Sequence, residues 1–237
     1  MSSKAPFFLA VDTGDIEIAK SWVLATQDHV LGFKLGLEFF TSLGSEGVKQ
    51  LKEITDADIF LDLKLHDIPN TVAGATRQIS QLKPRFLTVH ASGGRAMISA
   101  AVNEAPDVEI TAVTILTSLG SEDLSDIGFT SGPLESAVRL ALLAQAAGAR
   151  AIVCSPLEVH AVRQAVGPEL SIITPGVRSV SSISDDQQRT MDARGAIAAG
   201  ATYLVIGRPI TRAWAQGFVA LRERAASVAA ELSQIPR

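Results

Sequence analysis

The chain of 237 residues contains one cysteine, Cys154. A single thiol cannot form an internal disulfide, and it cannot provide the thiolates of a structural zinc site. The histidines are not paired at the spacing of metal ligands; they are His29, His66, His90 and His160. We therefore expect no disulfide and no metal, and we interpret Cys154 as a buried, unreactive thiol.

The chain also lacks blocks of Lys or Arg and long apolar runs. Its formal net charge is −4, which argues against a general nucleic-acid binder. Without a run of about 18 apolar residues we predict no transmembrane helix, and the start MSSKAPFFLAVD does not resemble a signal peptide. We expect a soluble cytoplasmic protein without nucleic-acid or membrane partners, although an anionic small substrate would need only local positive charge.

Short apolar runs alternate with amphipathic stretches along the whole chain, and hydrophobic residues make up 47% of it. The apolar runs predict strands at residues 7–12, 29–36, 58–64, 86–91, 109–117, 151–155, 171–177 and 203–208. The amphipathic stretches predict helices at residues 16–26, 45–55, 70–82, 94–104, 134–147, 157–166, 193–199 and 211–233. The Ser-rich stretch 179–190 is predicted to be a long loop.

This alternation of strands and helices indicates a parallel sheet, because parallel neighbours need helical crossovers. No linker rich in Gly, Ser or Pro divides the chain, and its repeats in about 240 residues are typical of a closed (β/α)8 barrel. We therefore predict a single α/β domain, residues 1–237, folded as a (β/α)8 TIM barrel. A doubly wound open sheet is the alternative.

The segment IFLDLKLHDIPNT, residues 59–71, places charged residues in an apolar strand, whose side chains alternate between two faces. One face, expected to meet the helices, consists of Ile59, Leu61, Leu63 and Leu65. The other, expected to face the barrel interior, consists of Phe60, Asp62 and Lys64. Burying a charge is costly unless it is paired, so Asp62 and Lys64 form either a structural ion pair or part of an active site.

Polar residues also end several other predicted strands, where barrel enzymes carry their catalytic groups. They are Asp12, Lys34, His90, Thr117, Gly207 and Arg208. A network of alternating charge is expected from Lys34, Asp62, Lys64 and Asp67. A protonated lysine fixed in such a network is a ready general acid, and an ionised carboxylate beside it would repel an anionic group on a substrate. The cluster therefore suits loss of an anionic group followed by protonation of the carbanion left behind.

The motif Asp-x-Lys-x-x-Asp-Ile-Pro-Asn-Thr at residues 62–71 resembles the signature of the orotidine 5′-phosphate decarboxylase family. Further segments resemble its bacterial members in the same order along the chain. They are LAVD at 9–12, GFKLGLEFF at 32–40, VHASGG at 89–94, LTS at 116–118, TPGVR at 174–178, DQ at 186–187 and VIGRPI at 205–210. The resemblance therefore spans nearly the whole chain.

This resemblance implies a carboxy-lyase that converts orotidine 5′-phosphate to UMP and CO2, the last step of de novo pyrimidine biosynthesis. It implies that the enzyme uses no metal and no organic cofactor. It also implies a homodimer whose active sites lie at the subunit interface.

The family has a Lys–Asp–Lys–Asp tetrad, which maps here onto Lys34, Asp62, Lys64 and Asp67. By resemblance, Lys64 would donate a proton to C6 of the pyrimidine, and Asp62 would lie against the substrate carboxylate. Asp67 and Thr71 would reach into the partner's site, with Ile68 lining its carboxylate pocket. Spacing alone, in contrast, would keep Asp67 in the same site as Lys64.

The resemblance also assigns residues to the rest of the substrate. Asp12 and Lys34 would contact the ribose hydroxyls. Thr117, or Ser118, would bind the pyrimidine edge, and Pro175 would also contact the substrate.

The substrate phosphate is expected to be bound at the end of the last strand. Gly207 permits close backbone approach, and Arg208 offers a charge-assisted hydrogen-bonding fork. By resemblance, Arg178 and Gln187 would close over the phosphate from the loop after the seventh strand.

Two other functions remain as alternatives. A related metal-dependent sugar-phosphate decarboxylase or aldolase could use the same barrel, but a Mg²⁺ site would need further carboxylates near Asp62, and Glu38 lies just beyond the second strand. A non-catalytic phosphate-binding barrel would be expected to have a broken tetrad, and the tetrad here is intact.

Overall fold

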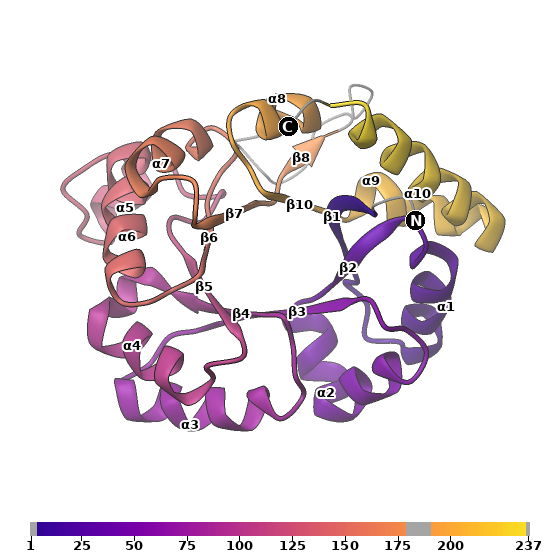
Figure 1. The fold of residues 1–237 in the computed structure, drawn as a ribbon, viewed down its shortest axis with the longest axis horizontal. Coiled ribbons are helices and arrows are strands. Elements are labelled where there is room, and N and C mark those ends of the chain that lie inside the picture. Colours follow the sequence, from indigo (N-terminus) through magenta and orange to yellow (C-terminus); the bar gives the residue numbers. More distant parts are fainter. Residues whose placement is uncertain (1–3, 179–190, 236–237) are drawn as a thin grey trace.

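The computed structural model describes residues 4–178 and 191–235. Eight parallel strands close into a barrel in the order β1-β10-β7-β6-β5-β4-β3-β2 (Figure 1). They are β1 (Ala5–Ala10), β2 (Val30–Leu35), β3 (Asp58–Leu65), β4 (Phe86–His90), β5 (Glu109–Val113), β6 (Ala151–Val153), β7 (Ser171–Thr174) and β10 (Tyr203–Ile206). The prediction of a (β/α)8 barrel is confirmed, and the open doubly wound sheet is excluded.

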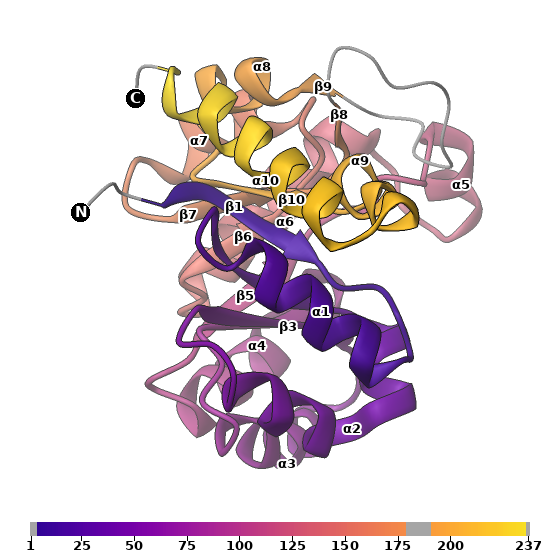
Figure 2. The same ribbon diagram turned by 90° about the vertical axis from the view of Figure 1, so that its right-hand side faces the viewer.

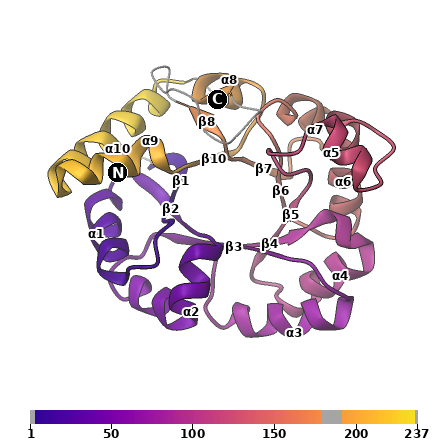
Figure 3. The ribbon, with the colours of Figure 1, turned by 180° about the vertical axis from the view of Figure 1, so that it is seen from behind.

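The helices form a ring outside the strands, seen from both ends of the barrel (Figures 1 and 3). They are α1 (Ile16–Thr26), α2 (Leu37–Lys52), α3 (Pro69–Ser80), α4 (Gly94–Glu104), α5 (Ser121–Asp126), α6 (Pro133–Ala146), α7 (Val159–Val166), α8 (Ala193–Ala198), α9 (Arg208–Thr211) and α10 (Phe218–Ser233), with the 3-10 turns η1 (Ala91–Gly93) and η2 (Arg212–Gln216). Within the described ranges, no helix is both long and apolar enough to cross a membrane.

The structure corrects several predicted boundaries. The strand predicted at 109–117 ends at Val113, because the chain leaves the sheet there to line a pocket. The helix predicted at 45–55 corresponds to the second part of α2, which begins at Leu37, is interrupted at Gly44 (φ 60°) and ends at Lys52. The single helix predicted at 211–233 is wrong: the chain forms α9, η2 and α10, and it breaks at Gly217, whose φ of 97° lies in the left-handed region.

Two features were not predicted, α5 and a small parallel sheet of β8 (Val177–Arg178) and β9 (Met191–Asp192). Both lie at the end of the barrel toward which the β1 arrow points (Figure 2). The stretch 179–190, predicted to be a loop, lies outside the described residues.

The two faces of β3 are as predicted. Ile59, Leu61 and Leu63 belong to the large core between strands and helices. Phe60 belongs to a second core inside the barrel. This result follows from side-chain alternation along the first part of the strand.

Aromatic rings fill the middle of the barrel. This aromatic layer consists of Phe8, Phe60, Phe86 and Tyr203, whose neighbouring ring centroids lie 5.5–5.9 Å apart, edge to face. Gly32 makes room for it, because a Cβ there would lie 2.7 Å from the Phe8 ring and 2.1 Å from the Asp58 carbonyl oxygen. The layer separates the two ends of the barrel.

An ionic cluster closes the amino-terminal end of the barrel below this layer. The guanidinium of Arg85 donates to Asp58 (2.7 Å), Glu109 (3.0 Å) and the Tyr203 hydroxyl (2.7 Å). Burial alone would lower the pKa of Arg85, but these hydrogen bonds raise it above its usual range. These hydrogen bonds give Arg85 a structural role, and the cavity that contains the charged strand-end residues lies at the opposite end of the barrel.

Candidate active site

A cavity of about 300 Å³ opens at the carboxyl ends of the barrel strands. Its polar lining residues come from β2 and β3, from the segments that directly follow β1 and β10, and from the loops after β5 and β7. The predicted site residues among them are Asp12, Lys34, Asp62, Lys64, Thr117, Pro175, Gly207 and Arg208. This position is the one at which (β/α)8 barrels carry their active sites.

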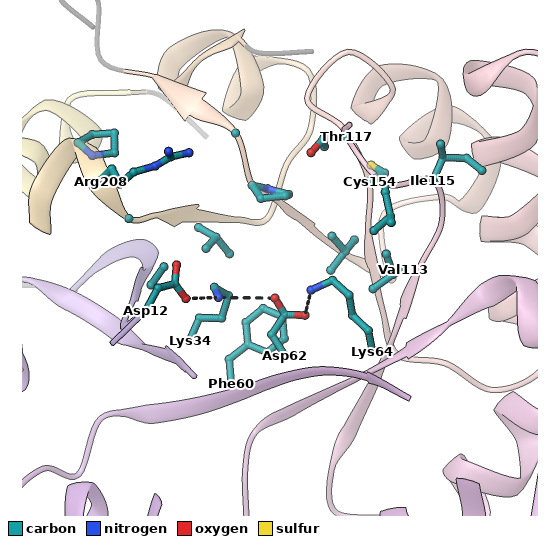
Figure 4. Close-up of a pocket in the computed structure, with 18 of the residues that line it drawn as sticks. Asp12, Lys34, Phe60, Asp62, Lys64, Val113, Ile115, Thr117, Cys154 and Arg208 are labelled. Atoms are coloured by element: carbon teal, nitrogen blue, oxygen red, sulfur yellow. Dashed lines mark hydrogen bonds and ion pairs between the residues drawn. The ribbon is translucent and has the colours of Figure 1, made fainter. Parts of the chain in front are cut away.

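Four charged side chains form a row of alternating sign along one side of this cavity (Figure 4). Lys34 Nζ lies 3.1 Å from Asp12 Oδ1 and 3.6 Å from Asp62 Oδ2. Lys64 Nζ lies 2.8 Å from Asp62 Oδ1. Each oxygen of the Asp62 carboxylate therefore faces a different ammonium group.

The Asp62 carboxylate is ionised although it is largely buried, with 14% of its side chain exposed. Burial alone would raise its pKa. The charges of Lys34 and Lys64, with hydrogen bonds from Lys64 and Thr88, outweigh burial and lower the pKa of Asp62 below its ordinary value. The cavity thus holds a fixed negative charge between two ammonium groups at neutral pH.

The backbone of β3 departs from regular strand geometry where it carries this row. Leu61 pairs with Leu87 of β4, and the next pair is Leu65 with Val89. The segment of β3 between these pairs is therefore longer than the matching segment of β4, as in a β-bulge. Lys64 has a φ of 50°, a left-handed conformation that is unfavourable for a residue with a Cβ. Strained residues of this kind persist where their surroundings hold them, often at functional sites.

An apolar wall stands beside the charged row. It consists of Phe60, Val113, Ile115, Val153 and Val205. Cys154 also lines the cavity and is buried, as expected. A low-dielectric wall strengthens the electrostatic effect of the neighbouring charges on any bound group.

Arg208 and Thr117 lie across the cavity from the row (Figure 4). Gly207 and Arg208 directly follow β10, and Arg208 begins the short helix α9. Of the two residues considered for the pyrimidine edge, Thr117 is among the lining residues and Ser118 is not. Arg212 also lines the cavity and was missed, because it was expected inside a long helix.

Two predicted phosphate residues are not placed by the structure. Arg178 is described only through its backbone in β8. Gln187 lies outside the described residues.

Asp67, Ile68 and Thr71 do not line the cavity of their own chain. They belong to a run of exposed residues, 66–71, between the end of β3 and the first turn of α3. Asp67 accepts a hydrogen bond from the Ile68 backbone N–H (2.6 Å), and Ile68 is 67% exposed. The tetrad suggested by spacing is therefore not assembled within one chain, since Asp67 stands apart from the row.

Two histidines lie near the row without lining the cavity. His90, at the end of β4, packs against His66 with 5.3 Å between ring centroids. Burial, with the nearby His66 and Lys64, lowers the pKa of His90. His90 is thus a packed neighbour of the site.

The carboxylate considered for a metal site does not approach the row. Glu38 lies in the first turn of α2, is exposed, and is not among the cavity residues. In the part of the chain that the structure describes, no three His, Cys, Asp or Glu side chains are grouped so as to hold a metal ion.

The fold and this site together define a (β/α)8-barrel enzyme with an ionised acid–base cluster at the mouth of the barrel. Residues 5–221 match the model of the orotidine 5′-phosphate decarboxylase / HUMPS family. The chain belongs to the orotidine 5′-phosphate decarboxylase family, and it is a decarboxylase of the carboxy-lyase class.

Individual relatives agree with this assignment. An orotidine 5′-phosphate decarboxylase of Thermobifida fusca is 49% identical over 97% of this chain and 97% of its own length. One from Frankia casuarinae is 45% identical over 96% of this chain and 89% of its own length. The crystal structure of orotidine 5′-phosphate decarboxylase from Lactobacillus acidophilus superimposes with a TM-score of 0.80 at 31% identity, covering 94% of this chain and 98% of that one.

Proposed function

We propose that this enzyme decarboxylates orotidine 5′-phosphate to UMP and CO2, the last step of de novo pyrimidine biosynthesis. The observation that carries the proposal is the buried, ionised Asp62 held between Lys34 and Lys64 at the mouth of the barrel. The names of the relatives agree with this substrate.

In the proposed reaction, Lys64 is the proton donor. The bond between C6 and the carboxylate carbon breaks, CO2 leaves, and the electron pair remains on C6. That carbon takes a proton from Lys64 Nζ, and solvent later reprotonates the amine. Lys64 suits this step because its ammonium is held 2.8 Å from Asp62 rather than free in solvent.

Asp62 is proposed to lie beside the substrate carboxylate. Two anions about 4 Å apart repel each other by roughly 4 kcal/mol at an effective dielectric of 20. The negative charge moves to C6 when CO2 leaves and is neutralised when Lys64 protonates that carbon, so the repulsion acts on the bound substrate and not on UMP. The lowered pKa of Asp62 keeps the repelling charge in place at neutral pH.

The remaining cavity residues are proposed to hold the rest of the nucleotide. Asp12 and Lys34 contact the ribose hydroxyls, and Thr117 and Pro175 contact the base. The phosphate is bound at Gly207 and Arg208, with Arg178 and Gln187 closing over it. Phosphate binding far from C6 provides binding energy that supports the chemical step.

We further propose that the enzyme is a cytoplasmic homodimer of a single-domain subunit, residues 1–237. Asp67 and Thr71 enter the partner's site, and Ile68 lines its carboxylate pocket. The exposed run 66–71 at the rim of the barrel supports this arrangement, because it leaves an apolar Ile68 uncovered in one chain.

A second candidate follows from the description of the matching family, which also includes HUMPS proteins. A metal-dependent sugar-phosphate decarboxylase or aldolase on the same barrel would need added Mg²⁺. The two functions are separated by following the loss of orotidine 5′-phosphate absorbance with purified protein in EDTA. Turnover in EDTA supports the first function, whereas no turnover with or without Mg²⁺ contradicts it.

The role of Lys64 is tested with Lys64→Ala in the same assay. We expect kcat to fall by about 10²- to 10⁴-fold, the usual contribution of a general acid, while UMP still binds. Lys49→Ala, which removes an exposed lysine of α2 paired with Glu46, is the control and should keep full activity. Near-normal turnover of Lys64→Ala would show that Lys64 is not the proton donor.

A further inference from the structure

The hydroxyl of Thr88 joins the two central residues of the charged row. Thr88 lies on β4, is fully buried, and is not among the cavity residues. The Lys64 backbone N–H donates to Thr88 Oγ1 (2.8 Å), and Thr88 Oγ1 donates to Asp62 Oδ1 (3.1 Å). The directions are fixed, because an N–H can only donate and an ionised carboxylate can only accept.

The first of these hydrogen bonds satisfies a backbone group that has left the regular ladder. β3 is irregular between Leu61 and Leu65, and Lys64 has left-handed backbone angles. A buried N–H without a partner is costly, and Thr88 provides the partner for Lys64. The hydroxyl thereby stabilises the backbone conformation from which the Lys64 side chain extends.

The second hydrogen bond sets the rotation of the Asp62 carboxylate. Asp62 Oδ1 accepts from both Lys64 Nζ (2.8 Å) and Thr88 Oγ1 (3.1 Å), which leaves Oδ2 to face Lys34. Rotation of the carboxylate would break the bond to Thr88. One hydroxyl therefore constrains both the backbone of Lys64 and the group against which its ammonium rests.

We propose that Thr88 is a positioning residue for decarboxylation, which holds Asp62 and Lys64 in a single geometry without touching the substrate. The proposal rests on the function proposed above for Lys64. Its role should appear in kcat rather than in nucleotide binding, because Thr88 lies behind Asp62 and does not line the cavity.

Thr111 provides a matched control. It lies opposite Thr88 on the neighbouring strand β5 and is also fully buried. Its hydroxyl donates to the Glu109 carbonyl oxygen (2.9 Å) and not to the charged row. Thr88→Val and Thr111→Val therefore make the same chemical change at the same level of burial, and only the first removes a bond to Asp62.

The experiment compares the wild type with Thr88→Val, Thr88→Ser and Thr111→Val in steady-state decarboxylation of orotidine 5′-phosphate and in UMP binding. We expect Thr88→Val to lower kcat by about 10- to 100-fold, since misplacement of a reacting group by about 1 Å has an effect of this size. The KM and the UMP dissociation constant should stay within about threefold of wild type. Thr88→Ser should restore most of kcat, and Thr111→Val should resemble the wild type.

A second readout is the acid limb of the profile of kcat against pH. The hydrogen bond from Thr88 helps to keep Asp62 ionised, so Thr88→Val should move this limb to higher pH and Thr111→Val should not. A general loss of packing would not produce this difference. If Thr88→Val does not fold, Thr88→Ser and Thr88→Ala, which differ by one oxygen atom, give the same comparison.

The outcomes separate this inference from the proposed function. Equal kcat values for Thr88→Val and Thr111→Val would overturn the positioning role alone, as would a Thr88→Ser variant as impaired as Thr88→Val. No turnover of orotidine 5′-phosphate by the wild type would overturn both.

Discussion

Replacing Asp62 with Asn should destabilise the protein, because it removes the negative charge between two ammonium groups. Removal of one partner of a buried ion pair typically costs about 3–5 kcal/mol. Here Lys34 keeps Asp12 at 3.1 Å, and 29% of the Lys64 side chain is exposed. We therefore expect the free energy of unfolding to fall by less, about 2–3 kcal/mol at neutral pH.

The effect should depend on pH in a defined direction. The pKa of Asp62 is lower in the folded protein than its ordinary value of 3.8. A carboxyl with a lowered folded pKa stabilises the protein fully above its unfolded pKa, and it loses that contribution as the pH falls through the folded pKa. The difference between wild type and Asp62→Asn should therefore be constant at neutral pH and shrink below about pH 4.

The measurement is urea unfolding followed by the fluorescence of Trp22 and Trp214, at neutral pH and at several acidic values. Glu104→Gln, which weakens the more exposed pair of Arg77 and Glu104, is the control and should produce the smaller loss. If Asp62→Asn is as stable as the wild type at neutral pH, the cost of burying the carboxylate equals the attraction of the lysines. The row would then contribute nothing to folding, and our electrostatic reasoning would be wrong.

Two further predictions concern the phosphate and the subunit interface. Arg208→Ala should weaken UMP binding by roughly 10- to 100-fold, the effect of one charge-assisted hydrogen bond, and leave uridine inhibition unchanged; equal UMP affinity would remove Arg208 from the phosphate site. Ile68→Asp should shift the protein toward a monomer in size-exclusion chromatography with light scattering and lower turnover at dilute enzyme. Val219→Asp changes a residue of similar exposure, 65%, on α10 and should remain a dimer; an intact Ile68→Asp dimer would argue against Ile68 at the interface.

The sequence was most informative where local geometry decides the outcome. Phe60 faces the barrel interior and Leu61 the helices, as predicted, because side-chain alternation depends only on the strand itself. Asp62 and Lys64 both reach the cavity as predicted, although Lys64 does so from an irregular, left-handed part of β3. The helices at 16–26 and 94–104 match the predicted ranges, since each carries an uninterrupted amphipathic pattern.

The sequence was least informative where segments distant along the chain meet. The left-handed backbone of Lys64 and the bond from its N–H to Thr88 depend on how β3 lies against β4. The signal for Thr88 in the sequence was a polar residue between the apolar Leu87 and Val89, in phase with Phe86 and His90. The position of Asp67 likewise depends on where β3 ends, which spacing could not show.

The closed amino-terminal end of the barrel limits the routes by which substrate can enter the cavity and products can leave it. The aromatic layer and the Arg85 cluster beneath it fill the barrel from one end to the floor of the cavity. Among the described residues, these groups block the amino-terminal side of the cavity, which opens at the carboxyl ends of the strands. In the proposed reaction, CO2 and the nucleotide product both leave through this opening, by which the substrate also enters, so the two departures share one route.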